Sequence, residues 1–155
     1  KESAARRHFR DGVETVLRGG GYKVKQLERQ DGDTFRRTIE EFVYPETSRA
    51  LVIALDPEAL LETAQILEDS SVYQEHVEGL YGRGTTTQIL NYLDRGIISG
   101  LCVTDDFSIG YLSIKRAVEI LSNQKLEEET VLDSYYIRKD DLRSPEFEKM
   151  LYPIE

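Results

Sequence analysis

Apolar residues gather along the chain in short runs that predict buried strands. The clearest run extends from Ile97 to Val103, opens after Gly96 and is too short for a helix of its own. A second apolar run, from Ala50 to Leu55, is followed by the turn residues Asp56 and Pro57. Runs that are apolar on both faces are typical of strands buried on both sides of a parallel sheet.

Weaker patterns predict the remaining elements. Alternating or short apolar stretches predict strands at residues 22–27, 76–80 and 131–137. Helical spacing of apolar residues predicts helices at residues 3–18, 34–43, 57–67, 88–94 and 108–121, with a short helical patch at 145–151. Because strands and helices alternate, we expect a three-layer α/β/α domain with an open, mostly parallel sheet, of the Rossmann-like or flavodoxin-like kind.

Composition places the chain among globular proteins with one domain. It has 155 residues and does not begin with methionine, so we expect a fragment or a processed piece. The formal net charge of -9 repels phosphate backbones, and we expect this piece to bind no nucleic acid. The single cysteine, Cys102, excludes an intrachain disulfide, and its apolar surroundings favour a buried hydrophobic residue over a reactive thiol.

Candidate catalytic groups are sparse. The only histidines, His8 and His76, have no cysteine or second histidine at the spacing of metal ligands. The glycine-containing loop expected from Tyr81 to Thr87 matches neither the P-loop nor the dinucleotide-binding fingerprint. We therefore expect no catalysis, no metal and no cofactor.

A polar corner follows the clearest strand and precedes a helix. In the stretch RGIISGLCVTDDFSIGY, residues 95–111, this corner consists of Thr104, Asp105 and Asp106. In open parallel sheets, ligands bind beyond the carboxyl ends of the strands, so the corner is the first site candidate. The stretch also resembles the last crossover of type I periplasmic binding proteins, which include ribose-binding type receptors and the effector domains of lactose-repressor-type regulators. Other segments resemble that family in the same order: Ser3 to Val13, Ala50 to Glu58, Val77 to Gly82 and Tyr136 to Ile154.

The resemblance implies an incomplete two-lobed protein. Residues 1–155 would form the C-terminal lobe as a single α/β domain, with a tail at 138–155. The N-terminal lobe, which is missing from this chain, would complete the ligand cleft. The helix at 106–123 would pack on that lobe, or would find another partner in this piece, for example in a homodimer.

The resemblance also implies ligand-binding positions. They are Arg7 or its neighbour Arg6, then Asp56 or Leu55 just before it, Tyr81 and Thr104, with Asp105 beside Thr104 in the polar corner. Sugar binders of the family commonly have Asp at the position of Tyr81 and Gln at that of Thr104. Losing that Asp removes an acceptor for paired hydroxyls, which argues against an ordinary monosaccharide.

The expected function is therefore binding of a small polar solute, a sugar or a sugar-like molecule. The parent protein would be the lipid-anchored, extracellular or periplasmic receptor of an ABC importer, or part of a sensor, with a membrane permease or sensor as partner. The alternative is the effector-binding domain of a cytoplasmic lactose-repressor-type regulator. A third, more distant alternative is a flavodoxin-like enzyme or phosphate-responsive domain.

Overall fold

The computed structural model describes residues 4–28, 33–43, 50–69, 71–122 and 130–152. Residues 1–3, 123 and 153–155 of the predicted segments lie outside these ranges. The elements in chain order are α1 (Ala4–Gly19), α2 (Asp33–Val43), β1 (Ala50–Ile53), α3 (Pro57–Glu68), α4 (Ser71–His76), β2 (Val77–Arg83), α5 (Thr87–Asp94), β3 (Gly100–Thr104), α6 (Asp106–Leu121), β4 (Ser134–Ile137), the 3₁₀ helix η1 (Lys139–Arg143) and α7 (Glu148–Leu151).

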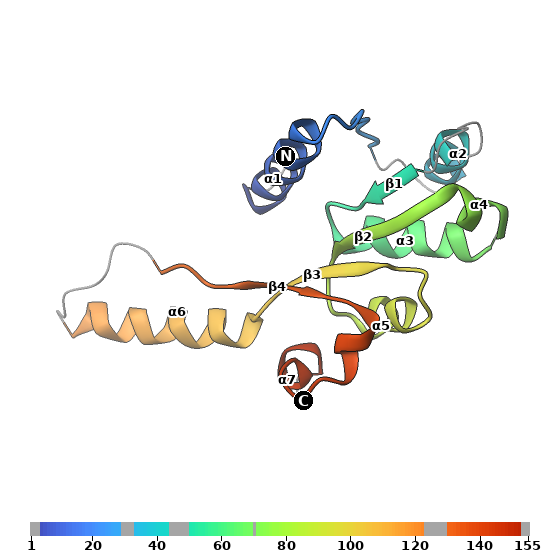
Figure 1. Cartoon of the computed structure of the whole chain (residues 1–155). Helices are drawn as coiled ribbons and strands as arrows, with labels where there is room; N and C mark the ends of the chain where they lie inside the picture. Colours follow the sequence, from blue (N-terminus) through green and yellow to red (C-terminus); the bar gives the residue numbers. More distant parts are fainter. Residues whose placement is uncertain (1–3, 29–32, 44–49, 70, 123–129, 153–155) are drawn as a thin grey trace.

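The four strands form one open sheet in the order β1-β2-β3-β4 (Figure 1). β1, β2 and β3 run parallel, and β4 returns antiparallel to β3 along the edge. This arrangement confirms the predicted α/β class with a mostly parallel sheet. Because the first three strands are parallel, their carboxyl ends meet at one edge of the sheet.

The core lies on the face of the sheet that α3 and α5 cover. Leu80 of β2, Leu101 of β3 and Ile137 of β4 point into it and are completely buried. Helix α3 contributes Leu60, which is 0% exposed, and the tail adds buried leucines from η1 and α7. The predicted tail thus secures the end of the chain to the core.

The opposite face is less well covered. Leu51 of β1 is 46% exposed and Tyr136 of β4 is 56% exposed, while Cys102 of β3 is half-buried. Helix α1 stands away from the middle of the sheet in Figure 1. The prediction that the strand ending at Val103 is buried on both faces holds only in part, because Leu101 and Val103 are buried on one face while Cys102 on the other is half-buried. That strand also begins later than predicted, at Gly100.

The prediction of a strand at residues 22–27 is wrong. Residues 22–28 have no regular structure, and Tyr22 is 66% exposed. Only Leu27 reaches a hydrophobic cluster, that of Phe35, Ile39 and Ile66. An alternating segment becomes a strand only where a neighbour satisfies its backbone hydrogen bonds. No described strand pairs with this one.

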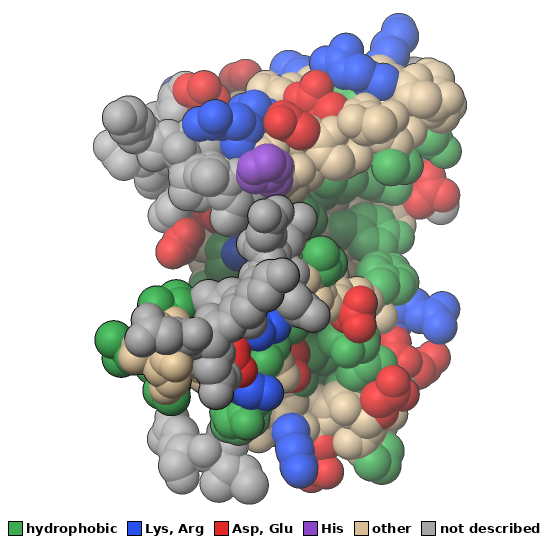
Figure 2. All heavy atoms as spheres, turned by 90° about the vertical axis from the view of Figure 1, so that its left-hand side faces the viewer, with side chains coloured by type: hydrophobic (Ala, Val, Ile, Leu, Met, Phe, Trp, Pro, Cys, Tyr) green, Lys and Arg blue, Asp and Glu red, His purple; other side chains and the backbone are tan. Residues whose placement is uncertain are grey.

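Helix α6 buries none of its residues. Phe107, Ile114 and Leu121 are 80%, 70% and 83% exposed, and with Tyr111 and Val118 they form a stripe at helical spacing. A shallow, mostly apolar depression runs along this stripe. α6 projects from the sheet in Figure 1, and Figure 2, viewed from that side, shows hydrophobic side chains at the surface. Among the described residues, no helix is long and apolar enough to cross a membrane.

Helices α3 and α5 are joined at their carboxyl ends by a polar cluster. The hydroxyl of Tyr92 donates a hydrogen bond of 2.7 Å to one carboxylate oxygen of Glu68, and Arg95 pairs with the other. The guanidinium of Arg95 also lies 5.6 Å from the centre of the Tyr92 ring. The hydrogen bonds from Tyr92 and Arg95 hold the pKa of Glu68 below its ordinary value of 4.5.

This cluster predicts how stability depends on pH. A carboxyl whose pKa is depressed by folding adds stability above its unfolded pKa and loses it as the pH falls through the folded value. Glu68→Gln is therefore expected to destabilise the chain most at neutral pH, and progressively less below pH 4.5. Urea unfolding at several pH values measures this difference. Tyr92→Phe removes one hydrogen-bond donor to Glu68, so it should narrow the pH range over which Glu68 changes the stability. If Glu68→Gln lowered the free energy of unfolding equally at all pH values, the depressed pKa of Glu68 would be contradicted.

Candidate binding site at the carboxyl edge of the sheet

Asp56 lies just beyond the end of β1 and caps α3. Its Oδ1 accepts a hydrogen bond of 2.8 Å from the backbone amide of Ala59, and Pro57 occupies the first turn of the helix. Its Oδ2 lies 3.8 Å from a guanidinium nitrogen of Arg6 on α1. Two of the residues predicted from sequence are thus brought together. Arg7, the next residue on α1, is exposed.

Thr104 and Asp105 lie at the end of β3, where α6 begins. Both carboxylate oxygens of Asp105 accept from Ser108: Oδ1 from its backbone amide at 3.0 Å and Oδ2 from its hydroxyl at 2.6 Å. These hydrogen bonds lower the pKa of Asp105. The hydroxyl of Thr104 donates to Asp106 at 3.2 Å. Asp105 therefore acts as the amino-terminal cap of α6, and each of its oxygens accepts a hydrogen bond.

Tyr81 lies inside β2, two residues before the strand ends. It is in register with Ile53 of β1 and Gly100 of β3, and its ring lies over Gly79, where a Cβ would come within 2.6 Å of the ring. The loop predicted from Tyr81 to Thr87 therefore begins later than expected, because the strand continues through Arg83. A ligand contact by Tyr81 stays a prediction.

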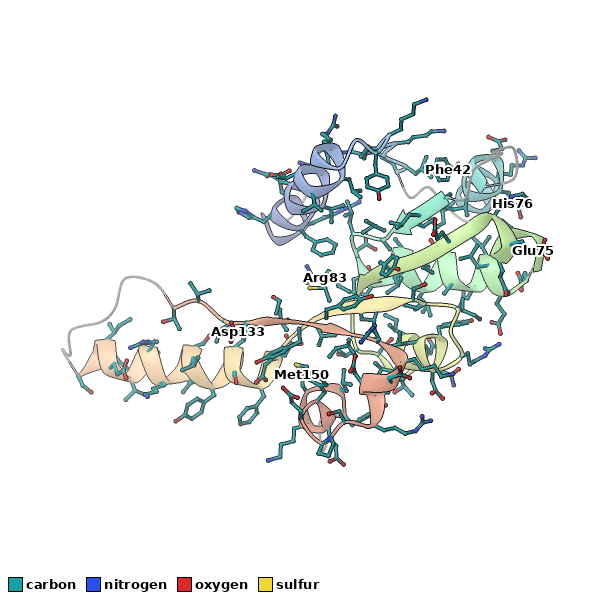
Figure 3. The ribbon with its side chains drawn as sticks, in the orientation of Figure 1. Phe42, Glu75, His76, Arg83, Asp133 and Met150 are labelled. Atoms are coloured by element: carbon teal, nitrogen blue, oxygen red, sulfur yellow. The ribbon has the colours of Figure 1, made fainter. Side chains whose placement is uncertain are left out.

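Arg83 is the strand-end residue that the sequence reasoning missed. It is the last residue of β2, is in register with Cys102, and is half-buried. Figure 3 shows Arg83 at this end of β2, on the side of the sheet toward α1. Within the described ranges, no hydrogen bond or ion pair engages its guanidinium. The alternation along β2 could have revealed it, since Leu80 and Gly82 face the core and Arg83 faces the other way.

The loop after Arg83 is fixed by close packing. Gly84 has a φ of 129°, and a Cβ there would lie 2.8 Å from Ile89 of α5 and 3.2 Å from Pro57 of α3. Thr86 then caps α5 by accepting a hydrogen bond from the amide of Ile89. Two helices thus hold the backbone immediately after Arg83 in place.

The edge as a whole is rich in guanidinium groups that donate hydrogen bonds. Arg6 and Arg83 supply donors in a planar fork, while the carboxylates of Asp56 and Asp105 are engaged in helix caps and an ion pair. No three His, Cys, Asp or Glu side chains of the described residues gather as metal ligands. The arrangement is suited to holding a polar molecule by hydrogen bonds.

No protein-family model matches the chain, and no curated protein sequence matches it. Solved structures do. A solute-binding protein of an ABC transporter from Agrobacterium vitis, bound to α-D-tagatopyranose, is 15% identical with a TM-score of 0.77, over 93% of this chain and 49% of that one. A carbohydrate transporter solute-binding protein from Agrobacterium radiobacter, in complex with D-arabinose, is 20% identical with a TM-score of 0.73. The similarity covers 92% of this chain and 49% of that one.

A third similar structure is described as an ABC transporter, LacI family transcriptional regulator from Brachyspira murdochii. It is 15% identical with a TM-score of 0.50, over 96% of this chain and 64% of that one. At these identities the similarity establishes the fold, which is the one that the resemblance to type I periplasmic binding proteins implied. The chain spans about half the length of the two Agrobacterium proteins.

Proposed function

We propose that this chain is one lobe of a non-catalytic receptor that binds a small polar solute, a sugar or a sugar-like molecule. The observation that carries the proposal is the ion pair between Arg6 and Asp56 at the carboxyl edge of the sheet. The fold around it is similar to that of sugar-bound solute-binding proteins. Ligands of open parallel sheets bind at this edge. The receptor would serve an ABC importer or a sensor and would contact a membrane permease or sensor protein.

A second lobe would complete the cleft. The uncovered stripe on α6 supports this part of the proposal, because a contiguous apolar surface is normally covered by another part of a protein or by a partner. We expect the N-terminal lobe of the parent protein to pack there, with a homodimer as the alternative. Such a receptor would act outside the cytoplasmic membrane, in the periplasm or at the cell surface, where a lipid anchor would hold it.

The alternative function is effector binding in a lactose-repressor-type regulator. The similarity to the Brachyspira murdochii protein supports effector binding as the second candidate function. The gene sequence upstream of residue 1 separates the two proposals. A signal peptide followed by a lipid-attachment cysteine would support the receptor, whereas a helix-turn-helix module would support the regulator.

A thermal-shift screen of the complete gene product tests solute binding. The panel contains pentoses, hexoses, polyols, sugar acids, sugar phosphates and, as a different class, amino acids. A ligand at a hundredfold over its dissociation constant adds about 2.7 kcal/mol to stability, which raises the melting temperature measurably. A shift with a sugar or sugar derivative supports the proposal. A folded protein that responds only to amino acids, or to nothing, contradicts it.

Arg7→Ala is expected to weaken ligand binding by about 1 to 3 kcal/mol, because a charged hydrogen bond to the ligand is lost. Titration calorimetry on the complete gene product measures the change. Arg18→Ala is the matched control, since Arg18 lies on the same helix and is paired with Glu14. Equal affinities for Arg7→Ala and the control would remove Arg7 from the site and would turn attention to its neighbour, Arg6.

A further inference from the structure

Acceptors that could grip the hydroxyl pairs of a neutral sugar are already engaged at the carboxyl edge. Each oxygen of Asp105 accepts one hydrogen bond from Ser108. In Asp56, Oδ1 accepts one from the amide of Ala59, and Oδ2 lies 3.8 Å from the guanidinium of Arg6. On β2, Tyr81 brings no carboxylate to this edge, and its ring lies back over Gly79. The side chains of this edge therefore favour a ligand that accepts hydrogen bonds.

Arg83 is the donor that these contacts leave without a partner. It ends the central strand β2, faces away from the core, and has no hydrogen bond or ion pair among the described residues. The packing of Gly84 against α3 and α5 fixes the backbone just after it. Arg83 is thus a half-buried cation on a rigid support at the place where the fold binds ligands.

A neutral ligand would leave this cation poorly compensated. When two lobes close over a ligand, water is excluded, and a buried charge without a counter-charge is costly. A carboxylate or phosphate group provides that counter-charge and fits the planar fork of a guanidinium with two parallel hydrogen bonds. The net charge of -9 repels anions at long range, so a local cation would be needed to retain one.

We propose that the solute is acidic, a sugar acid or a sugar phosphate, and that Arg83 binds its anionic group. This inference rests on the proposed function and specifies the class of solute. It assigns Arg83 as the residue that selects acidic over neutral sugars.

Titration calorimetry with matched ligand pairs tests the inference on the complete gene product. The pairs are D-galactose with D-galacturonate and D-ribose with D-ribose 5-phosphate, so that the two arms separate carboxylate from phosphate. In at least one pair, the acidic member is expected to bind at least about tenfold more tightly than its neutral partner. Raising the salt concentration should weaken the acidic member selectively.

Arg83→Gln is expected to weaken binding of the acidic ligand by about ten- to a hundredfold while leaving binding of the neutral partner nearly unchanged. Arg83→Lys keeps the charge but loses the fork, so an intermediate loss is expected. Arg143→Gln is the control: this exposed arginine pairs with Asp94 at the opposite end of α5 from the loop that follows Arg83. Unfolding curves of each variant establish that it is folded.

The outcomes separate the two proposals. If neutral sugars bind as tightly as their acidic counterparts, the inference is overturned and the proposed function stands. If acidic ligands are preferred but Arg83→Gln and Arg143→Gln behave alike, the role of Arg83 is overturned. If the folded wild-type protein binds no sugar, sugar acid or sugar phosphate, the proposed function fails and the inference fails with it.

Discussion

Replacing Leu60 by alanine is expected to lower the free energy of unfolding by about 2 to 5 kcal/mol. Leu60 is 0% exposed and lies between α3 and the sheet, where its methyl groups are 3.0 Å from the position that a Cβ on Gly82 would take. Truncation leaves a cavity beneath the strand that ends in Arg83. Urea unfolding measures the loss.

Leu51→Ala serves as the control for this substitution. Leu51 is 46% exposed on the opposite face of the sheet, so its truncation is expected to cost less than about 1 kcal/mol. Comparable losses for the two variants would mean that the α3 face is not the centre of the core. Because Asp56 caps α3, we also expect Leu60→Ala to disturb the first turn that holds this carboxylate.

Gly84→Ala is expected to be nearly as damaging, at about 2 to 5 kcal/mol. The φ of 129° is strained for any residue with a Cβ, and the added carbon would lie 2.8 Å from Ile89 and 3.2 Å from Pro57. Strain and overpacking therefore act together at this position. Thermal and urea unfolding measure the effect.

Gly12→Ala is the matched control for the glycine substitution. Gly12 lies in α1, and a Cβ there meets nothing within 4 Å. Alanine is the better helix former, so this variant is expected to be stabilised by about 0.5 to 1 kcal/mol. Opposite signs for the two substitutions are the expected result. A Gly84→Ala variant that is as stable as the wild type would show that the loop after β2 is not specially constrained.

The sequence alone was sufficient to predict the parallel part of the sheet. The apolar run at residues 50–55 contains strand β1, which ends at Ile53 before the cap at Asp56. The fold class follows from the alternation of such runs with helices. Residues 22–27 show the limit of this reasoning. Their alternation favours a strand, yet pairing depends on whether a neighbouring strand is available, and a local pattern does not contain that information.

The site was predictable to a smaller extent. Asp56, Thr104 and Asp105 were placed near strand ends because turn residues mark those ends in the sequence, whereas Arg6 on α1 was named only from the family resemblance. Arg83 was missed because the strand was predicted to end at Leu80, and the glycines that follow Tyr81 favour a loop. The engagement of Asp105 by Ser108 was also hidden, since a helix cap and a ligand-binding carboxylate look alike in a sequence.

β3 and β4 are hydrogen-bonded neighbours, although the chain between them runs out along α6 before it returns. Thr104, at the end of β3, is in register with Ser134, at the start of β4. The hydrogen bonds between these strands therefore hold together the two ends of the connection formed by residues 105–133. The entropy lost on closing a flexible loop grows only with the logarithm of its length, about 0.6 kcal/mol for each doubling. Changes in the length of this connection should therefore cost the sheet little. Related sequences can differ in length there while β3 and β4 keep their register.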